Sequence, residues 1–234
     1  MKKGKLGVIG GMGPLASQMF YQRVLDMTQA TCDQDNIPAV ILSDTQMPDR
    51  TVAIASGNTA PLEKKLLEDA QLLETCGCTV LAIPCNTSHA FVPRLQELIV
   101  TPIVNMIDET ARALQKLGAG RVGILATDGT VKAGLYHAAC EKLGIEAVTP
   151  PPATQALVMS VIYDEIKRGE KGSREKFVAI DAVMRDLGCE RAVLACTELS
   201  VYRLYNGLPD YYVDAMDVLA KQAVLSCGYP LRSV

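Results

Sequence analysis

Short apolar segments alternate with longer amphipathic segments along the whole chain of 234 residues. The apolar segments lack the in/out alternation of a half-exposed strand, which is typical of parallel strands covered on both faces. We predict strands at residues 6–9, 39–42, 80–83, 103–104, 122–125, 147–148 and 192–195. We predict helices at about residues 15–31, 61–75, 107–117, 132–143, 154–168, 175–187 and 214–225, with Gly118, Gly144, Gly169 and Gly188 at helix ends. This order predicts the α/β class with mostly parallel sheets.

The chain contains an internal repeat. The segment LGVIGGMG at residues 6–13, a strand entering a glycine-bearing turn, matches VGILATDG at residues 122–129, 116 residues further on. Later, GCTVLAIPCNT at residues 77–87 aligns without gaps with GCERAVLACTE at residues 188–198, a separation of 111. Similar separations in the same order indicate two related halves. We assign residues 1–105 with 207–234 to one half and residues 106–206 to the other.

Each half has a cysteine directly after its later matched strand, Cys85 in the first and Cys196 in the second. Ligands of open α/β sheets bind outside the carboxyl ends of the strands. If the halves face each other across a pseudo-two-fold axis, the two thiols oppose one another over a shared cleft. One thiolate could then remove a proton from a carbon while the opposite thiol delivers one, which inverts that carbon.

Such chemistry needs polar groups around the thiols. A free cysteine has a pKa of about 8.5 and an amino-acid α-proton is a very weak acid, so a thiolate and a developing carbanion must both be stabilised. Asn86, Thr87 and Thr197 offer amide, hydroxyl and backbone donors. Arg50, in a predicted loop after the second strand, can hold a carboxylate bidentately, and Lys167 could hold a second anion. Alternatively, Arg50 and Lys167 are solvated charges on the protein surface that bind no ligand.

The overall charge excludes several classes of partner. Lys plus Arg is 23 and Asp plus Glu is 26, giving a net charge of −3 with no block of like charges. This charge pattern disfavours a nucleic acid or a membrane surface as partner. The chain has only 5% aromatic residues and no Trp, which disfavours a surface on which the bases of single-stranded nucleic acid would stack. The N-terminus lacks the pattern of a signal peptide, and no apolar run reaches the roughly 20 residues of a membrane span. We therefore expect a cytoplasmic protein.

The other six cysteines are expected to be reduced, small hydrophobic residues. They are Cys32, Cys76, Cys78, Cys140, Cys189 and Cys227. A zinc site is the alternative, because Cys76, Cys78, Cys85 and His89 could supply four ligands. No Cys-x-x-Cys pair exists, however, and structural zinc sites usually show paired ligands at short spacing. We therefore predict no metal.

Six motifs together resemble the aspartate/glutamate racemase family. They are GGMGPLAS at residues 10–17, PDRT at 48–51, PCNTSH at 84–89, GILAT at 123–127, IYDEIKRG at 162–169 and ACTEL at 195–199. The resemblance spans the chain from the first strand to the last helix. It implies two Rossmann-like halves with the active site between them, no pyridoxal phosphate or other cofactor, and a homodimer.

The resemblance also implies roles for individual residues. Cys85 and Cys196 would be the two acid/base residues, with Cys85 deprotonating the D-enantiomer and Cys196 the L-enantiomer. Glutamate-specific members carry Asp-Ser-Gly in the first turn and Cys-Thr-His at the second cysteine, whereas this chain has Gly-Gly-Met-Gly and Glu198, which points to the aspartate branch. Glu198 could orient a donor, bind the substrate ammonium or raise the pKa of Cys196. The residues that would hold or surround the substrate are Met12, Arg50, Asn86, Thr87, Thr127, Lys167, Thr197 and Glu198.

We therefore predict an isomerase that interconverts L- and D-aspartate, with glutamate as a second candidate. Related chemistry on the same fold, such as hydantoin racemisation, maleate-type isomerisation or one-thiol decarboxylation, is the alternative, and so is a catalytically silent amino-acid-binding module. A dinucleotide-dependent oxidoreductase is a weaker alternative: residues 11–16 satisfy a loose Gly-x-Gly-x-x-Ala pattern, but the acidic residue expected about 20 positions on is missing. We expect His89 to be a capping or half-buried residue and His137 to lie on the surface.

Overall fold

The computed structural model describes residues 3–233, which form two compact units. Unit 1 comprises Met1–Met106 with Met216–Val234, and unit 2 comprises Ile107–Ala215. Each unit is built on a parallel sheet, so the predicted α/β class with parallel sheets is confirmed. Within residues 3–233, no helix combines the length and the apolar character needed to cross a bilayer.

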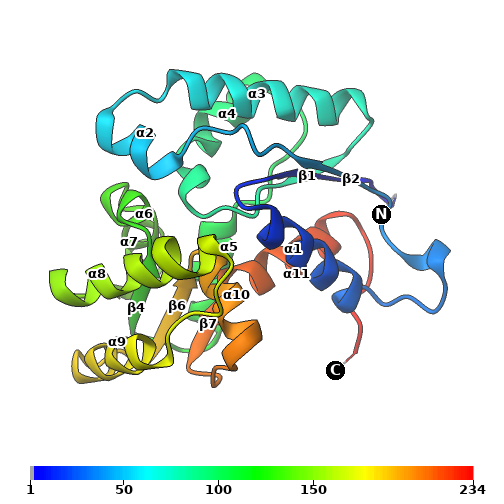
Figure 1. The fold of residues 1–234 in the computed structure, drawn as a ribbon. Helices are drawn as coiled ribbons and strands as arrows, with labels where there is room; N and C mark the ends of the chain where they lie inside the picture. The colour runs from blue at the N-terminus through cyan, green and yellow to red at the C-terminus, as the bar shows by residue number, and fades with distance from the viewer. Residues whose placement is uncertain (1–2, 234) are drawn as a thin grey trace. The chain divides into compact units, whose positions relative to one another are not determined.

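The sheet of unit 1 has the strand order β2-β1-β3, with β1 (Leu6–Gly10) between β2 (Ala39–Ser43) and β3 (Val80–Ala82). Leu81 also forms a parallel bridge with Ile103. Helices α3 and α4 lie over one face of this sheet, and α1 and α11 lie over the other (Figure 1). The helices of unit 1 are α1 (Pro14–Met27), α2 (Arg50–Ser56), α3 (Ala60–Thr75), α4 (Val92–Leu98) and most of α11 (Ala215–Ser226), with 3-10 turns at Asp33–Asp35 and Thr87–Ala90.

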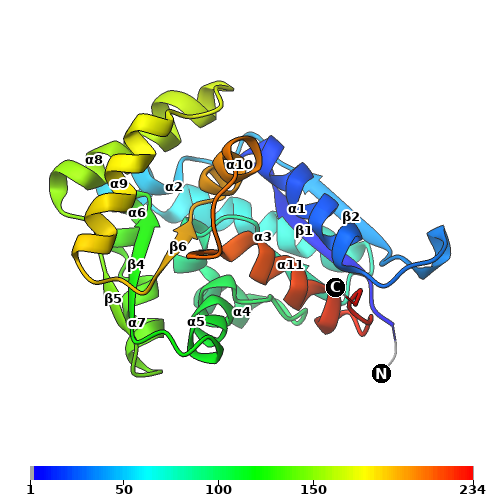
Figure 2. The ribbon, with the colours of Figure 1, turned by 90° about the horizontal axis from the view of Figure 1, so that it is seen from below.

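The sheet of unit 2 has the order β5-β4-β6-β7, from β4 (Arg121–Ala126), β5 (Glu146–Val148), β6 (Arg191–Ala195) and β7 (Tyr212–Asp214). Helices α8 and α9 lie on one side of this sheet, and α5 and α7 lie on the other (Figure 2). The helices are α5 (Met106–Lys116), α6 (Asp128–Lys132), α7 (Leu135–Glu141), α8 (Pro152–Ser160), α9 (Arg174–Asp186) and α10 (Thr197–Asn206), with a π-helical turn at Val161–Glu165 and a 3-10 turn at Ile166–Arg168.

The internal repeat corresponds to a repeated topology. In both units the first strand is central, the second strand lies on one side of it and the third on the other. The shared Gly-Cys dipeptide is a helix end in both units. Gly77 and Gly188 have φ values of 74° and 73°, and the following Cys78 and Cys189 donate their N–H to the carbonyls of Leu73 and Met184 at 3.1 Å. This bond closes a Schellman motif, which needs a left-handed residue and therefore favours glycine.

Several predicted elements differ from the observed ones. The predicted loop that carries Arg50 contains helix α2, which Asp49 caps by accepting a hydrogen bond from the N–H of Val52 at 2.9 Å. Strand β7 was not predicted because it has only three residues, Tyr212–Asp214, and no apolar run. Strand β7 pairs with β6, and residues 207–215 therefore belong to unit 2 by their contacts, whereas we predicted them in the N-terminal half. The predicted helix at 132–143 is interrupted at Gly134, whose φ is 64°.

Asp69 on α3 is an ionisable side chain inside the core of unit 1. It is only 5% exposed, and its Oδ2 has no hydrogen-bond partner among the described residues. Burial, with the nearby charge of Asp44, raises the pKa of Asp69 to about 6, although Lys65 opposes the shift. Because its pKa is higher in the folded than in the unfolded protein, Asp69 favours folding below its unfolded pKa and loses that contribution as the pH rises through about 6.

We expect Asp69→Asn to be more stable than the wild type at pH 8, by up to about 3 kcal/mol, because the variant has no buried charge to desolvate. The difference should shrink as the pH falls through about 6 and disappear below the ordinary aspartate pKa of 3.8, where the carboxyl group is protonated in both states. Urea unfolding at pH 8 and below this ordinary pKa measures the difference. Glu68→Gln, a change at a half-exposed site on the same helix, is the control and should show no such pH dependence. Equal stability of Asp69→Asn and wild type at pH 8 would contradict this account.

Candidate functional site

The turn after β1 is held in one conformation by its glycines and by Ser17. Gly11 has a φ of 88°, and a Cβ there would lie 2.3 Å from the carbonyl oxygen of Asp44, so only glycine fits. The Ser17 hydroxyl accepts a hydrogen bond from the N–H of Gly11 at 2.9 Å and donates to the carbonyl of Gly13 at 3.1 Å. The turn is therefore rigid around Met12, which is 3% exposed.

Cys85 lies just beyond β3, where the chain enters the 3-10 turn Thr87–Ala90. Cys85, Asn86 and Thr87 are all buried. The hydroxyl of Ser88 donates to the sulfur of Met12 at 3.2 Å, which joins this turn to the turn after β1. Met12 and Cys85 also belong to one buried hydrophobic cluster. The structure therefore brings together three of the residues predicted for the first half, Met12, Cys85 and its neighbour Asn86.

His89 fixes the backbone next to Cys85. Its side chain is buried, with Nδ1 2.9 Å from the carbonyl oxygen of Cys85 and Nε2 accepting a hydrogen bond from the N–H of Met106 at 3.1 Å. Because Nε2 accepts, Nδ1 must carry the proton and donate to Cys85. His89 is thus buried rather than half-buried, and it links the Cys85 carbonyl to Met106 within unit 1. His137 is partly buried, and its Nε2 lies 3.1 Å from the hydroxyl of Thr149.

Arg50 is the first residue of α2 and not a loop residue. Helix α2 contacts the 3-10 turn that follows Cys85, so Arg50 belongs to the same edge of the sheet as the cysteine. The guanidinium is partly buried and one of its nitrogens, Nη1, donates to the carbonyl of Pro48 at 3.1 Å. This bond holds the guanidinium close to its own backbone.

In unit 2, Cys196 and Thr127 follow neighbouring strands. Ala126 of β4 pairs with Ala195 of β6, so the residue after each strand lies at the same edge of the sheet. Cys196 is the N-cap residue of α10, and Thr127 is the N-cap residue of α6, where its hydroxyl accepts from the N–H of Thr130 at 3.3 Å. Both side chains are buried.

A buried carboxylate links Cys196 to Lys167. The thiol of Cys196 donates to Oε2 of Glu198 at 2.8 Å, and Oε1 of Glu198 lies 3.0 Å from Nζ of Lys167. The hydroxyl of Thr197 donates to the same Oε2 at 3.3 Å. Lys167 also lies over the ring of Tyr163, 5.0 Å from its centroid. The predicted residues Cys196, Thr197, Glu198 and Lys167 thus form one cluster.

The surroundings of Cys196 favour its protonated form. Burial raises the pKa of the Cys196 thiol well above its ordinary value, and the charge of Glu198 and the hydrogen bond to it raise it further. The ammonium of Lys167 opposes the shift. The unit therefore presents a buried thiol whose protonated form is favoured, in contact with a carboxylate. Of the three roles that the sequence allows for Glu198, this contact agrees with raising the pKa of Cys196.

All eight cysteines are free thiols, and both Cys32 and Cys76 are exposed. In the described part of the chain, no group of three or more His, Cys, Asp or Glu side chains could hold a metal ion. Both ring nitrogens of His89, one of the four residues of the zinc alternative, are engaged by the backbone.

Comparisons with known proteins agree with this architecture. The profile of the family described as Asp/Glu/Hydantoin racemase matches residues 9–223, and the chain belongs to this family. The aspartate racemase of Picrophilus torridus is 30% identical, with a TM-score of 0.82 over 98% of this chain and 96% of that one. A putative Asp/Glu racemase from Yersinia pestis shares the fold at 23% identity, with a TM-score of 0.80 over 97% and 99% of the two chains.

A third relative is a broad-specificity amino-acid racemase, RacX, of Bacillus subtilis, 24% identical over 149 residues. The match covers 61% of this chain and 63% of RacX, which is less than two thirds of that protein's length. The resemblance to the racemase family that the motifs indicated is therefore confirmed.

We expect Glu198→Gln to make Cys196 more reactive. Removing the negative charge removes one cause of the raised pKa while Lys167 remains, so more thiolate forms at a given pH. One pKa unit corresponds to a tenfold change, and we expect Cys196 to be alkylated by iodoacetamide roughly tenfold faster at pH 8. Peptide mass spectrometry would measure the rate at each cysteine, with Cys32 as internal reference. An unchanged or slower rate at Cys196 would contradict the assigned role of Glu198.

Proposed function

We propose that this protein is a cofactor-independent racemase that interconverts L- and D-aspartate, with glutamate as a second substrate. The observation that carries the proposal is the buried contact between the Cys196 thiol and Glu198, at 2.8 Å. A two-base racemase needs one residue that donates a proton and a means of restoring that proton. Cys196 and Glu198 fit this requirement. The 30% identity to an aspartate racemase over nearly the whole chain supports aspartate as the substrate.

In the proposed reaction, Cys85 and Cys196 act on opposite faces of the α-carbon. With D-aspartate, the Cys85 thiolate takes the α-proton and the Cys196 thiol delivers its own proton to the other face. With L-aspartate the roles exchange: the Cys196 thiolate removes the α-proton and the Cys85 thiol supplies its own proton to the other face, which restores the starting state of both thiols. Glu198 would exchange a proton with Cys196 between turnovers. Each direction moves one proton onto carbon and one off it, so no oxidant or cofactor is consumed.

The polar groups around each thiol have matching tasks in this proposal. Asn86 and Thr87, on the buried turn after Cys85, and Thr127 and Thr197, at the ends of β4 and β6, would donate hydrogen bonds to the α-carboxylate on which negative charge develops. Arg50 and Lys167 would hold the two carboxylates of an acidic substrate. Lys167 would then leave Glu198 for the substrate, which frees Glu198 to accept a proton. Met12 would shape the first turn. We further propose that the protein acts as a homodimer.

We expect Cys85→Ser and Cys196→Ser each to lower racemisation by roughly a hundredfold or more, since a serine hydroxyl is far too weak an acid and base to replace a thiol. Proton NMR in heavy water, without pyridoxal phosphate, would follow the α-proton of L-Asp, D-Asp, L-Glu and D-Glu separately. The exposed Cys32→Ser is the matched control and should keep wild-type rates.

The outcomes separate the candidates. Exchange with glutamate alone would move the substrate assignment to glutamate. Exchange that survives either serine substitution would overturn the two-thiol mechanism. The absence of exchange with all four amino acids would overturn the proposal as a whole, and hydantoins would then be the next substrates to test.

A further inference from the structure

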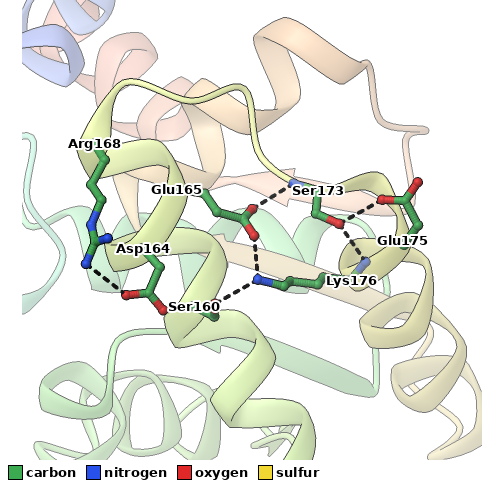
Figure 3. Close-up of polar contacts among 7 residues, drawn as sticks. All are labelled: Ser160, Asp164, Glu165, Arg168, Ser173, Glu175 and Lys176. Atoms are coloured by element: carbon green, nitrogen blue, oxygen red, sulfur yellow. Dashed lines mark hydrogen bonds and ion pairs between the residues drawn. The ribbon is translucent and has the colours of Figure 1, made fainter.

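Two adjacent carboxylates on the segment before Lys167 point in different directions. Asp164 is exposed and pairs with Arg168 across 3.4 Å on the surface (Figure 3). Glu165 is only 8% exposed and points toward the start of α9. A buried carboxylate must be satisfied by hydrogen bonds or an opposite charge. The hydrogen-bond and ion-pair partners of Glu165 therefore show which part of the unit this side chain holds in place.

Both oxygens of Glu165 contact the first turn of α9. Oε1 lies 2.5 Å from Nζ of Lys176, and Oε2 accepts a hydrogen bond from the N–H of Ser173 at 2.7 Å (Figure 3). Lys176 in turn donates to the hydroxyl of Ser160 at 2.8 Å. The Ser173 side chain caps α9 by accepting from the N–H of Lys176 at 3.2 Å. Glu165 therefore joins the end of the α8 segment to the N-terminus of α9.

The segment that Glu165 fastens is irregular. Helix α8 ends at Ser160 and gives way to a π-helical turn, then to the 3-10 turn Ile166–Arg168 that carries Lys167. The side chain of Lys167 is therefore not oriented by the regular hydrogen bonds of a continuous α-helix. The chain then returns to Ser173 through Gly172, where an added Cβ would lie 2.5 Å from the ring of Tyr202. Tyr202 belongs to α10, the helix that carries Glu198.

We propose that Glu165 is a positioning residue, whose carboxylate fastens the irregular turn to α9 and so holds the ammonium of Lys167 against Glu198, beside Cys196. Lys167 follows Glu165 by two residues, and its Nζ reaches Glu198 at 3.0 Å. Among the described residues, the carboxylate of Glu165 is hydrogen-bonded to Ser173 and paired with Lys176, not with Cys196 or Glu198, so we expect any effect on the thiol to pass through Lys167. The catalytic consequence rests on the proposed racemase function, but the position of Lys167 does not.

The reactivity of Cys196 reports that position without any substrate. Among the described residues, the charged groups named as causes of the raised Cys196 pKa are Glu198, which raises it, and Lys167, which lowers it and so favours the thiolate. The titratable phenol of Tyr136 also interacts with this thiol. If Glu165→Gln lets Lys167 move away, the thiolate becomes less favourable. We expect alkylation of Cys196 by iodoacetamide at pH 8 to slow by roughly three- to tenfold, which corresponds to half to one pKa unit. Lys167→Met should slow it to a similar extent.

The double variant Glu165→Gln/Lys167→Met distinguishes positioning from general damage to the fold. If Glu165 acts through Lys167, the double variant is alkylated no more slowly than Lys167→Met alone, because there is nothing left to position. Additive effects, or an unchanged rate in Glu165→Gln, would overturn the proposal. Lys176→Met breaks the same contact from the side of α9 and should slow alkylation in the same way, which keeps the test valid should Glu165→Gln fold poorly.

Asp164→Asn is the matched control, since it removes a carboxylate from the same turn without touching α9. It should leave the alkylation rate, its pH profile and the melting temperature unchanged. If the protein racemises aspartate, Glu165→Gln should raise the KM for aspartate toward the KM of the Lys167→Met variant. If no amino acid is racemised while alkylation follows the expected pattern, the proposed function fails and the role of Glu165 stands.

Discussion

The parallel pairing of β1 with β3 and of β4 with β6 is the constraint on which the site depends. Neighbouring parallel strands must be joined by crossover connections, so the polypeptide leaves every strand at the same edge of the sheet. Cys85 and the Met12 turn share the edge of one sheet for this reason, and Cys196 and Thr127 share the edge of the other. A crossover helix must also end sharply to bring the chain back, and the Gly77-Cys78 and Gly188-Cys189 motifs provide that ending.

These helix ends explain why the repeat was visible in the sequence. A Schellman motif needs glycine at one position, and the small residue after it is buried against the first strand. An added Cβ on Gly7 would lie 3.1 Å from the sulfur of Cys78, and one on Gly123 would lie 3.5 Å from that of Cys189. Backbone conformation or packing therefore constrains three matched pairs, Gly7 with Gly123, Gly77 with Gly188, and Cys78 with Cys189. The sequence could predict the order of strands and helices because such requirements act locally.

Two parts that depend on contacts between distant residues could not be predicted. Strand β7 has three residues and is defined by its pairing with β6. The helix at residues 50–56 was missed for a different reason, because its signal is a local one, the Asp49 cap. The Asp49-Arg-Thr-Val sequence does contain this signal, since an aspartate that begins a helix accepts from the third residue on. Glu165 and Lys176 gave no signal, because an ion pair between a π-helical turn and the start of another helix has no characteristic spacing.

The two thiols sit in the same place in equivalent sheets, yet their surroundings have diverged. In the alignment of the two halves, Glu198 corresponds to Thr87, a neutral residue. Cys196 therefore has a carboxylate in hydrogen-bond contact, while the backbone next to Cys85 is fixed by His89 through a carbonyl. Two bases that are to exchange one proton across a carbon cannot both begin protonated. The repeated fold supplies two thiols at equivalent positions, and only Cys196 of the two has a carboxylate, Glu198, at the matched neighbouring position. In the proposed reaction, this difference between the two halves would let Cys196 act as the proton donor toward D-aspartate.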